Sequence, residues 1–285
     1  MAEFKRPFPA LTPTQRLHLE AFGYIVIERA ISPELVARLR DKTYEIEEDF
    51  RRTGKFKHGS KAMYGSSREY FRLDNLPHVD PAYLDYVAHP YLVGMAEEII
   101  GNEARLEQSD AHIRRPPADK SEQSVTFHRG ASEDMVWRSN DGLYHCHFVK
   151  TLTNLTDLGP DDGGTMVIAG SHKLAHLNDK EIIAAAGSDP RLIHSVVAPA
   201  GSTLLFFEST IHSSGVIRSD HDRLLIVAGY TPTMFQAFEG YDPEPSFLEQ
   251  TPDEFRPLLT GSRRYGRLKA EKTRKLSQPA EVWNR

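Results

Sequence analysis

Two histidines and an arginine in the second half of the sequence have the types and spacing of a metal site with a carboxylate ligand beside it. His128 stands in the segment TFHRG and His212 in the segment STIHSSG, and Arg223 follows eleven residues after His212. Neutral imidazole binds Fe, Zn, Cu and Ni. Arginine is a rigid fork of donors that can bind a carboxylate through two parallel hydrogen bonds. Ser214 adds a hydroxyl between His212 and Arg223.

The context of the two histidines favours metal binding over a purely structural role. A single histidine in a strand is more often a hydrogen-bonded side chain than a ligand. Two histidines on separate strands of one β-domain, however, can converge in its interior, and Arg223 lies on the next expected strand after His212. His145 and His147 form a rival pair across Cys146, but no third ligand motif accompanies them. We therefore place the metal at His128 and His212.

These residues need a β-rich framework, and the second half of the sequence predicts one. From about residue 104, short segments of β-type residues alternate with turn clusters such as GPDDGG at 159–164. Many short strands of this kind indicate a sandwich or barrel. The expected strands are Arg105–Arg114, Ser124–His128, Tyr144–Asn154, Gly164–Ile168, Ile193–Val197, Ser202–Phe207 and Leu224–Thr231.

The first hundred residues are predicted to be mostly helical. Thr12 and Ser32 each precede a proline and have the pattern of a helix N-cap. Gly23 ends the first helix before a short β-branched strand at 24–27. A further helix is expected over 81–100. We expect these helices to pack on one face of the β core.

The remaining segments complete a single expected domain. It comprises a helical part over about 1–103, a β core over about 104–235 and a C-terminal extension over about 236–285. Residues 52–70 are polar, basic and glycine-containing, which predicts a loop of the kind that often acts as a lid or binding segment. The stretch 262–275 has seven Lys or Arg against one Glu and is interpreted as a solvated helix face or tail rather than an interaction patch.

Composition excludes several classes of protein. The 285 residues carry a formal net charge of −5, which argues against a nucleic-acid-binding surface. The single cysteine, Cys146, excludes an intrachain disulfide and a multi-cysteine zinc site. No apolar run reaches the about 18 residues of a membrane span, and the N-terminus lacks the apolar core of a signal peptide. We expect a cytoplasmic enzyme with a small-molecule substrate and no nucleic-acid or membrane partner; the oligomeric state is not predicted.

The ordered motifs resemble the phytanoyl-CoA dioxygenase (PhyH) family of non-haem Fe(II)- and 2-oxoglutarate-dependent oxygenases. The block LTDLGPDDGGTMVIAGSHK at 155–173 is similar to a turn and strand of that family, and His212, Ser214 and Arg223 match its distal histidine, serine and 2-oxoglutarate arginine in type and spacing. The resemblance implies a double-stranded β-helix (jelly-roll, cupin-like) core with N-terminal helices on one face. It also implies that His128 and His212 bind Fe(II) and that Arg223 and Ser214 hold 2-oxoglutarate, with O2 as the second cosubstrate.

Thr153 is a further candidate for holding 2-oxoglutarate. Alternation along the strand from Phe148 to Leu155 puts Thr151 and Thr153 on one face and Lys150 with Leu152 on the other. The threonine face either looks into the barrel, where Thr153 would contact 2-oxoglutarate, or lines the core.

The sequence departs from the family pattern at Gly130. The family usually has His-x-Asp, whereas this chain reads His128-Arg129-Gly130 and therefore lacks the carboxylate ligand at that position. The open iron position could take water or chloride, and chloride there is the arrangement of the related halogenases. Alternatively, a nearby acid could supply the ligand, or iron binding could be lost. The acids considered are Glu133, Asp134 and Asp141.

Three functions follow from this pattern. The preferred one is hydroxylation of an unactivated C–H of a small molecule, with 2-oxoglutarate decarboxylated to succinate. The alternatives are a halogenase with chloride beside Gly130, and a catalytically silent small-molecule-binding protein on the same fold. His128, His212, Ser214 and Arg223 are all present, which argues against the silent protein.

Overall fold

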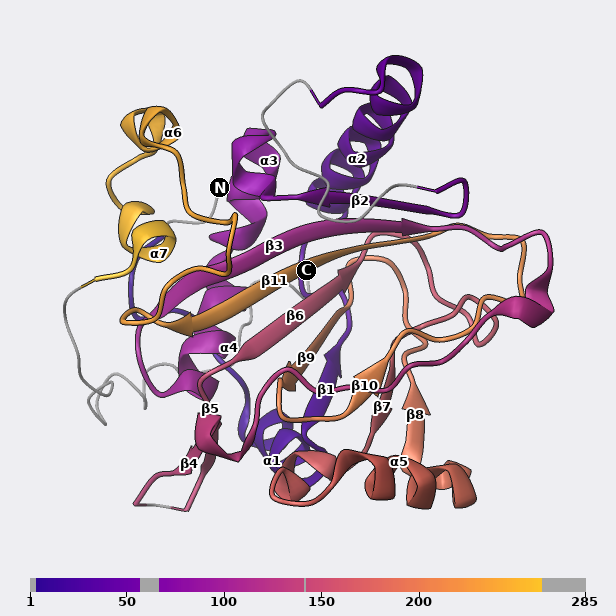
Figure 1. Cartoon of the computed structure of the whole chain (residues 1–285). Helices are drawn as coiled ribbons and strands as arrows, with labels where there is room; N and C mark the ends of the chain where they lie inside the picture. Colours follow the sequence, from indigo (N-terminus) through magenta and orange to yellow (C-terminus); the bar gives the residue numbers. More distant parts are fainter. Residues whose placement is uncertain (1–3, 57–66, 141, 263–285) are drawn as a thin grey trace.

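A six-stranded antiparallel sheet forms the centre of the structure, a computed structural model that describes residues 4–56, 67–140 and 142–262 (Figure 1). A second, three-stranded sheet packs against it, and two further strands form a small ribbon. In spatial order the large sheet contains β1 (Tyr24–Ile27), β9 (Thr203–Phe207), β6 (Val149–Asn154), β11 (Arg223–Pro232), β3 (Ala104–Arg114) and β2 (Tyr70–Asp74). The second sheet contains β10 (His212–Ser213), β7 (Met166–Ile168) and β8 (Ile193–Ser195), and the ribbon contains β4 (Val136–Arg138) and β5 (Tyr144–Cys146).

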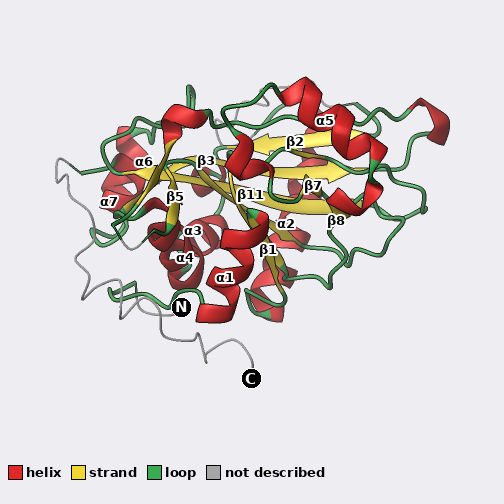
Figure 2. Ribbon diagram, turned by 90° about the horizontal axis from the view of Figure 1, so that it is seen from below, coloured by secondary structure: helices red, strands yellow, loops and turns green. Residues whose placement is uncertain are grey.

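Helices cover one face of the large sheet. Figure 2 shows α1, α3 and α4 gathered on the side away from α5, which lies by β7 and β8. The α-helices are α1 (Pro13–Phe22), α2 (Pro33–Thr53), α3 (Pro81–Val87), α4 (Pro90–Ile100), α5 (Asp179–Ser188), α6 (Pro245–Gln250) and α7 (Arg256–Thr260). Short 3-10 turns occur at Leu76–His78, Lys120–Glu122, Glu133–Met135, Ser171–Leu174 and Pro190–Leu192. None of the helices in the described ranges has the length and apolar character of a membrane span.

The two faces of the large sheet belong to different apolar clusters. On β9, Leu205 and Phe207 pack in the main core with the helices. Leu204 and Phe206 point the other way and pack with Val167 of the second sheet. Side chains alternate along a strand, so one strand contributes to both layers. The space between the two sheets is therefore the place where residues from both can meet.

Local signals at the N-terminal helices are confirmed. Thr12 forms a capping box with Gln15 at the start of α1, and Ser32 caps α2 through the backbone N–H of Leu35. Gly23 ends α1 at φ 85°, a left-handed conformation that glycine adopts without strain. The helix α2 extends to Thr53, and residues 57–66 of the loop expected over 52–70 lie outside the described residues.

The structure corrects several expected elements. The helix expected over 81–100 is two helices, because Pro90 has no backbone N–H and holds His89 in an extended conformation at ψ 120°. The expected strand Tyr144–Asn154 is divided into β5 and β6. Ser124–His128 is not a strand, and only His128 makes a bridge, to His212. The helix α5 was not expected.

The large sheet also takes both of its edge strands, β1 and β2, from the part of the chain before residue 104. The helical part and the β core thus share one sheet, and we propose that they form one domain. The basic stretch 262–275 lies outside the described residues except for Ser262.

We expect Gly94 to be essential for the packing of α4. A Cβ added there would lie 2.0 Å from the backbone oxygen of Pro9 and 2.8 Å from the Cβ of Phe8. Gly94→Ala should lower the free energy of unfolding by about 1–3 kcal/mol because of this overpacking. Gly187 in α5 is a matched control, because a Cβ there meets nothing within 4 Å; Gly187→Ala should raise stability by about 0.5–1 kcal/mol. Urea unfolding measures both, and equal effects would contradict the prediction.

Candidate active site

His128 and His212 lie side by side. The backbone N–H of His128 donates to the oxygen of His212 at 2.9 Å, and the N–H of His212 donates back at 2.8 Å. Their ring centroids are 4.4 Å apart. His212 begins β10 and is buried, whereas His128 is exposed. The pair is therefore fixed by a backbone bridge and reaches solvent through His128.

The hydrogen bonds of both rings suit a metal. Nδ1 of His128 faces the backbone oxygen of Thr126 at 3.2 Å, and Nδ1 of His212 faces that of Thr210 at 2.9 Å. A carbonyl only accepts, so each Nδ1 carries the hydrogen and each Nε2 keeps its lone pair free. Burial lowers the pKa of His212 to about 4, which keeps this ring neutral at pH 7. A pair of imidazoles that each keep Nε2 for a metal fits Fe(II).

Gly130 lies against the side chain of Glu208. A Cβ at position 130 would be 2.4 Å from Oε1 and 2.8 Å from Cγ of Glu208. The backbone N–H of Gly130 also donates to the oxygen of Glu208 at 3.1 Å. Position 130 has no positive φ, so a larger residue is opposed by the Glu208 side chain and not by the backbone conformation.

Glu208 is a buried acid that the sequence analysis did not select. Burial raises the pKa of its carboxyl to about 7, and within the described part of the chain its Oε2 has no hydrogen-bond partner. Its signal in the sequence is a lone acid in the apolar run LLFFEST, four residues before His212. The nearby acids that were considered lie elsewhere: Glu133 and Asp134 are exposed, and Asp141 lies outside the described residues.

As they stand, the described side chains include no group of three or more His, Cys, Asp or Glu placed to hold a metal ion. Within the described ranges, the structure thus brings two histidines together without a third His, Cys, Asp or Glu placed with them as a metal group.

Arg223 is buried at the start of β11 with unused donors. Its Nη2 donates to Oγ1 of Thr165 at 2.7 Å, whereas its Nε and Nη1 have no partner among the described residues. Burial and the neighbouring Arg114 lower the pKa of Arg223 to about 9, so it remains a cation at pH 7. Buried guanidinium donors without partners fit an incoming carboxylate.

The strand register links Arg223 to the histidine pair. His212 pairs with Val167 and Ser213 pairs with Met166, so Thr165, the partner of Arg223, is two residues from the partner of His212. Two residues along a strand span about 7 Å. Thr165 stands in the block 155–173, but its contact with Arg223 was not predicted.

The structure does not bring Thr153 to this site. Thr153 is buried on the helix side of β6, where Tyr86 donates to its Oγ1 at 2.8 Å and Oγ1 of Thr203 lies at 2.7 Å. Leu152, on the opposite face, packs with the cluster between the sheets. Of the two interpretations of this threonine, lining the core is the one that the structure supports. Ser214 is exposed, and the side-chain partner of Arg223 is Thr165.

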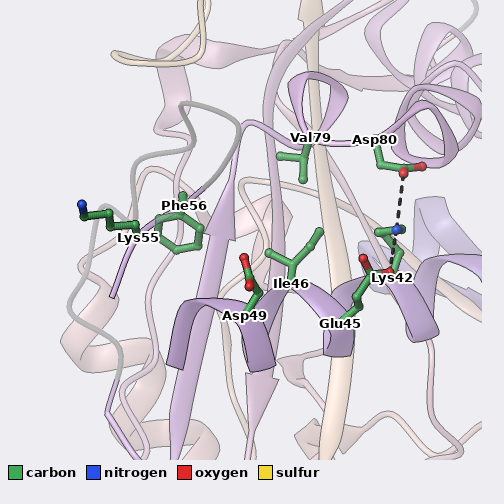
Figure 3. A pocket seen from close by; sticks show the side chains of 8 residues that line it. All are labelled: Lys42, Glu45, Ile46, Asp49, Lys55, Phe56, Val79 and Asp80. Atoms are coloured by element: carbon green, nitrogen blue, oxygen red, sulfur yellow. Dashed lines mark hydrogen bonds and ion pairs between the residues drawn. The ribbon is translucent and has the colours of Figure 1, made fainter. Parts of the chain in front are cut away.

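The rival histidine His145 and a pocket beside α2 lie apart from His128 and His212. His145 stacks on Trp137 at 4.1 Å, and its Nδ1 faces the backbone oxygen of Ile99 at 2.9 Å, which is a structural arrangement. Figure 3 shows a pocket between α2 and the start of α3, where Lys42 and Asp80 lie 3.8 Å apart. It is lined by Lys42, Glu45, Ile46, Asp49, Lys55, Phe56, Val79 and Asp80 and contains no predicted site residue.

The two facing sheets, with the histidine pair and the buried Arg223, form a double-stranded β-helix fold. The same fold is found in HygX from Streptomyces hygroscopicus, solved with nickel and 2-oxoglutarate bound: the TM-score is 0.63 at 22% identity, over 81% of this chain and 91% of HygX. It is also found in the carbocyclase SnoK from nogalamycin biosynthesis, with a TM-score of 0.59 at 17% identity, over 85% of this chain and 92% of SnoK.

The particular family follows from the sequence profile. Residues 19–225 match the phytanoyl-CoA dioxygenase (PhyH) family, and the chain belongs to it. An ectoine dioxygenase from Nocardia farcinica is 23% identical over 259 residues, which cover 83% of each chain. The predicted family and fold are confirmed. The chain is a dioxygenase-class enzyme of the iron- and 2-oxoglutarate-dependent type.

Proposed function

We propose that this enzyme hydroxylates an unactivated C–H of a small molecule, with Fe(II) held by His128 and His212. The observation that carries the proposal is the pair of Nδ1–H groups bound to backbone carbonyls, which leaves both Nε2 atoms free for the metal. When bound, iron supplies the activation of O2. In the balanced reaction, the substrate, O2 and 2-oxoglutarate give the hydroxylated substrate, succinate and CO2.

The chain's own residues bind and orient the cosubstrate. Arg223 pairs with the distal carboxylate of 2-oxoglutarate through the donors that have no protein partner. Thr165 holds the guanidinium in place from the second sheet, and Ser214 is proposed as a second donor. Phe206, whose ring lies 4.6 Å from that of His212, excludes water from the buried side of the histidine.

The substrate is proposed to be a small molecule, because the ectoine dioxygenase relative is named for one. A cytoplasmic location and the absence of nucleic-acid or membrane partners stay predictions. The halogenase remains the alternative function, since Gly130 provides no carboxylate ligand. The side chain of Glu208 fills the space beside Gly130, which favours hydroxylation.

Turnover assays separate the three functions. With Fe(II), O2 and 2-oxoglutarate, we expect succinate release that rises when a substrate is present, and a product heavier by one oxygen atom. Adding chloride should leave the product mass unchanged. A chlorinated product would establish the halogenase instead, and no succinate above a metal-free control would support the silent binding protein.

A further inference from the structure

We propose that Glu208 supplies the carboxylate ligand that Gly130 cannot provide. This inference rests on the proposed metal site at His128 and His212. It assigns the missing ligand to a residue that is 78 positions away in the sequence (208 − 130) but adjacent in space. Among the described residues, Glu208 and the two histidines are not placed as a three-residue metal group, so ligation requires the Glu208 side chain to turn toward the imidazoles.

The first observation is that Glu208 takes the place of a side chain at position 130. In a His-x-Asp motif, the aspartate side chain would begin at the Cβ of position 130. Here the carboxylate oxygen Oε1 of Glu208 lies 2.4 Å from that Cβ position, and its Cδ lies 3.0 Å away. The Glu208 carboxylate therefore occupies the volume in which a side chain at position 130 would begin. The backbone N–H groups of Gly130 and Ala131 both donate to the oxygen of Glu208, at 3.1 and 3.2 Å, and hold the two segments together.

The second observation is that Glu208, which directly follows β9, continues the face of that strand on which Phe206 meets His212. Its N–H donates to the oxygen of Phe148 at 3.0 Å, which continues the pairing of β9 with β6 by one residue. Alternation then puts Glu208 on the face of Leu204 and Phe206. Because Phe206 contacts His212, the side chain of Glu208 emerges into the layer that holds the histidines.

The third observation is that this buried acid needs a cation. Its side chain is buried, and its Oε2 has no hydrogen-bond partner in the described ranges. Lys150 is close enough to influence it but donates instead to Glu107 at 2.7 Å and to Gln108 at 2.8 Å. A buried carboxylate without a partner is costly, and a divalent metal held by neighbouring histidines would compensate it.

Metal binding tests the role without relying on turnover. We would titrate Co(II) alone into the full chain and record its affinity and visible spectrum. Glu208→Gln keeps the size of the side chain but removes the charge, and we expect it to weaken Co(II) binding by roughly 10- to 100-fold or more. Glu133→Gln changes an exposed acid near His128 and is the matched control, for which we expect no change.

A rescue variant separates ligation from a structural role. Glu208→Ala removes the side chain that opposes a larger residue at position 130. Adding Gly130→Asp to that protein should then restore most of the Co(II) affinity and a spectrum close to that of the unmodified chain. Gly130→Asp alone should give no such gain, because the Glu208 carboxylate is still present. Thermal unfolding of each variant checks that it is folded.

The outcomes distinguish this inference from the proposed function. Unchanged Co(II) affinity in Glu208→Gln would overturn the role of Glu208 while leaving the histidine pair in place. A loss in Glu208→Gln that the double variant does not recover would assign Glu208 a structural role and also overturn the inference. If the unmodified chain does not bind Co(II), the proposed metal site itself is wrong.

Discussion

The His212→Ala protein is expected to lose iron and, with it, succinate formation. His212 is one of two proposed protein ligands with a free Nε2, and its backbone also bridges to His128. Removal of an outer-shell partner of a metal ligand already costs roughly 10- to 100-fold in affinity, so loss of a ligand itself should cost at least that much. Anaerobic equilibrium dialysis with Fe(II) measures the affinity, and succinate release measures the consequence.

A second histidine serves as the control for this experiment. His145 is also buried and hydrogen-bonded, through Nδ1 to the backbone oxygen of Ile99, but it stacks on Trp137 in the β4–β5 ribbon. His145→Ala should lower thermal stability and leave iron affinity intact. Stoichiometric iron and normal succinate release in His212→Ala would show that the metal is bound elsewhere, and loss of iron in His145→Ala would point to the rival pair.

Arg223→Leu is expected to abolish the binding of 2-oxoglutarate. The guanidinium is fully buried, and two of its nitrogen atoms have no partner in the part of the chain that the structure describes. A carboxylate that enters this site without the arginine would be a buried, unpaired charge, which costs about 3–5 kcal/mol. That cost corresponds to a loss of affinity of roughly 100- to 1000-fold or more. Calorimetric titration of 2-oxoglutarate into the metal-loaded protein measures it.

The stability of the ligand-free protein separates this role from a structural one. Burial lowers the pKa of Arg223, so the buried cation is unfavourable before a ligand arrives. Arg223→Leu should therefore leave the free energy of unfolding unchanged or raise it. Arg105 is a buried arginine that donates to the backbone oxygen of Phe235, and Arg105→Leu should do the reverse: lower stability and keep 2-oxoglutarate affinity. Unchanged affinity in Arg223→Leu would exclude the proposed role.

Much of the fold was predictable because its signals are local. Thr12 and Ser32 cap helices whichever core they pack on, and Gly23 ends α1 because glycine adopts the left-handed C-cap conformation without strain. The strands β3, β7, β8, β9 and β11 fall within or close to the expected segments for the same reason. The break at Pro90 was equally local and was overlooked, although the residue before a proline disfavours helix.

What the sequence by itself determined is the set of chemical groups and their order. His128, His212 and Arg223 sit in motifs recognisable without coordinates, and they carry the family assignment. Alternation also predicts that Thr153 and Leu152 point to opposite faces of one strand. It does not determine which of the two faces is directed toward the histidines. Hydrogen bonds to Tyr86 and Thr203 answer that question, and they come from other elements.

Only the tertiary structure decided what lies beside Gly130. The glycine and Glu208 are far apart in sequence and come together because the His128 segment bridges to β10 while Glu208 directly follows β9. Local propensity and spacing carry no information about such a contact, since sheet packing creates it. For the same reason the sequence pointed to Glu133 and Asp134, which are close along the chain but exposed on the surface. Glu208 lies beside Gly130 in space, but it is too distant along the chain for sequence spacing to identify it.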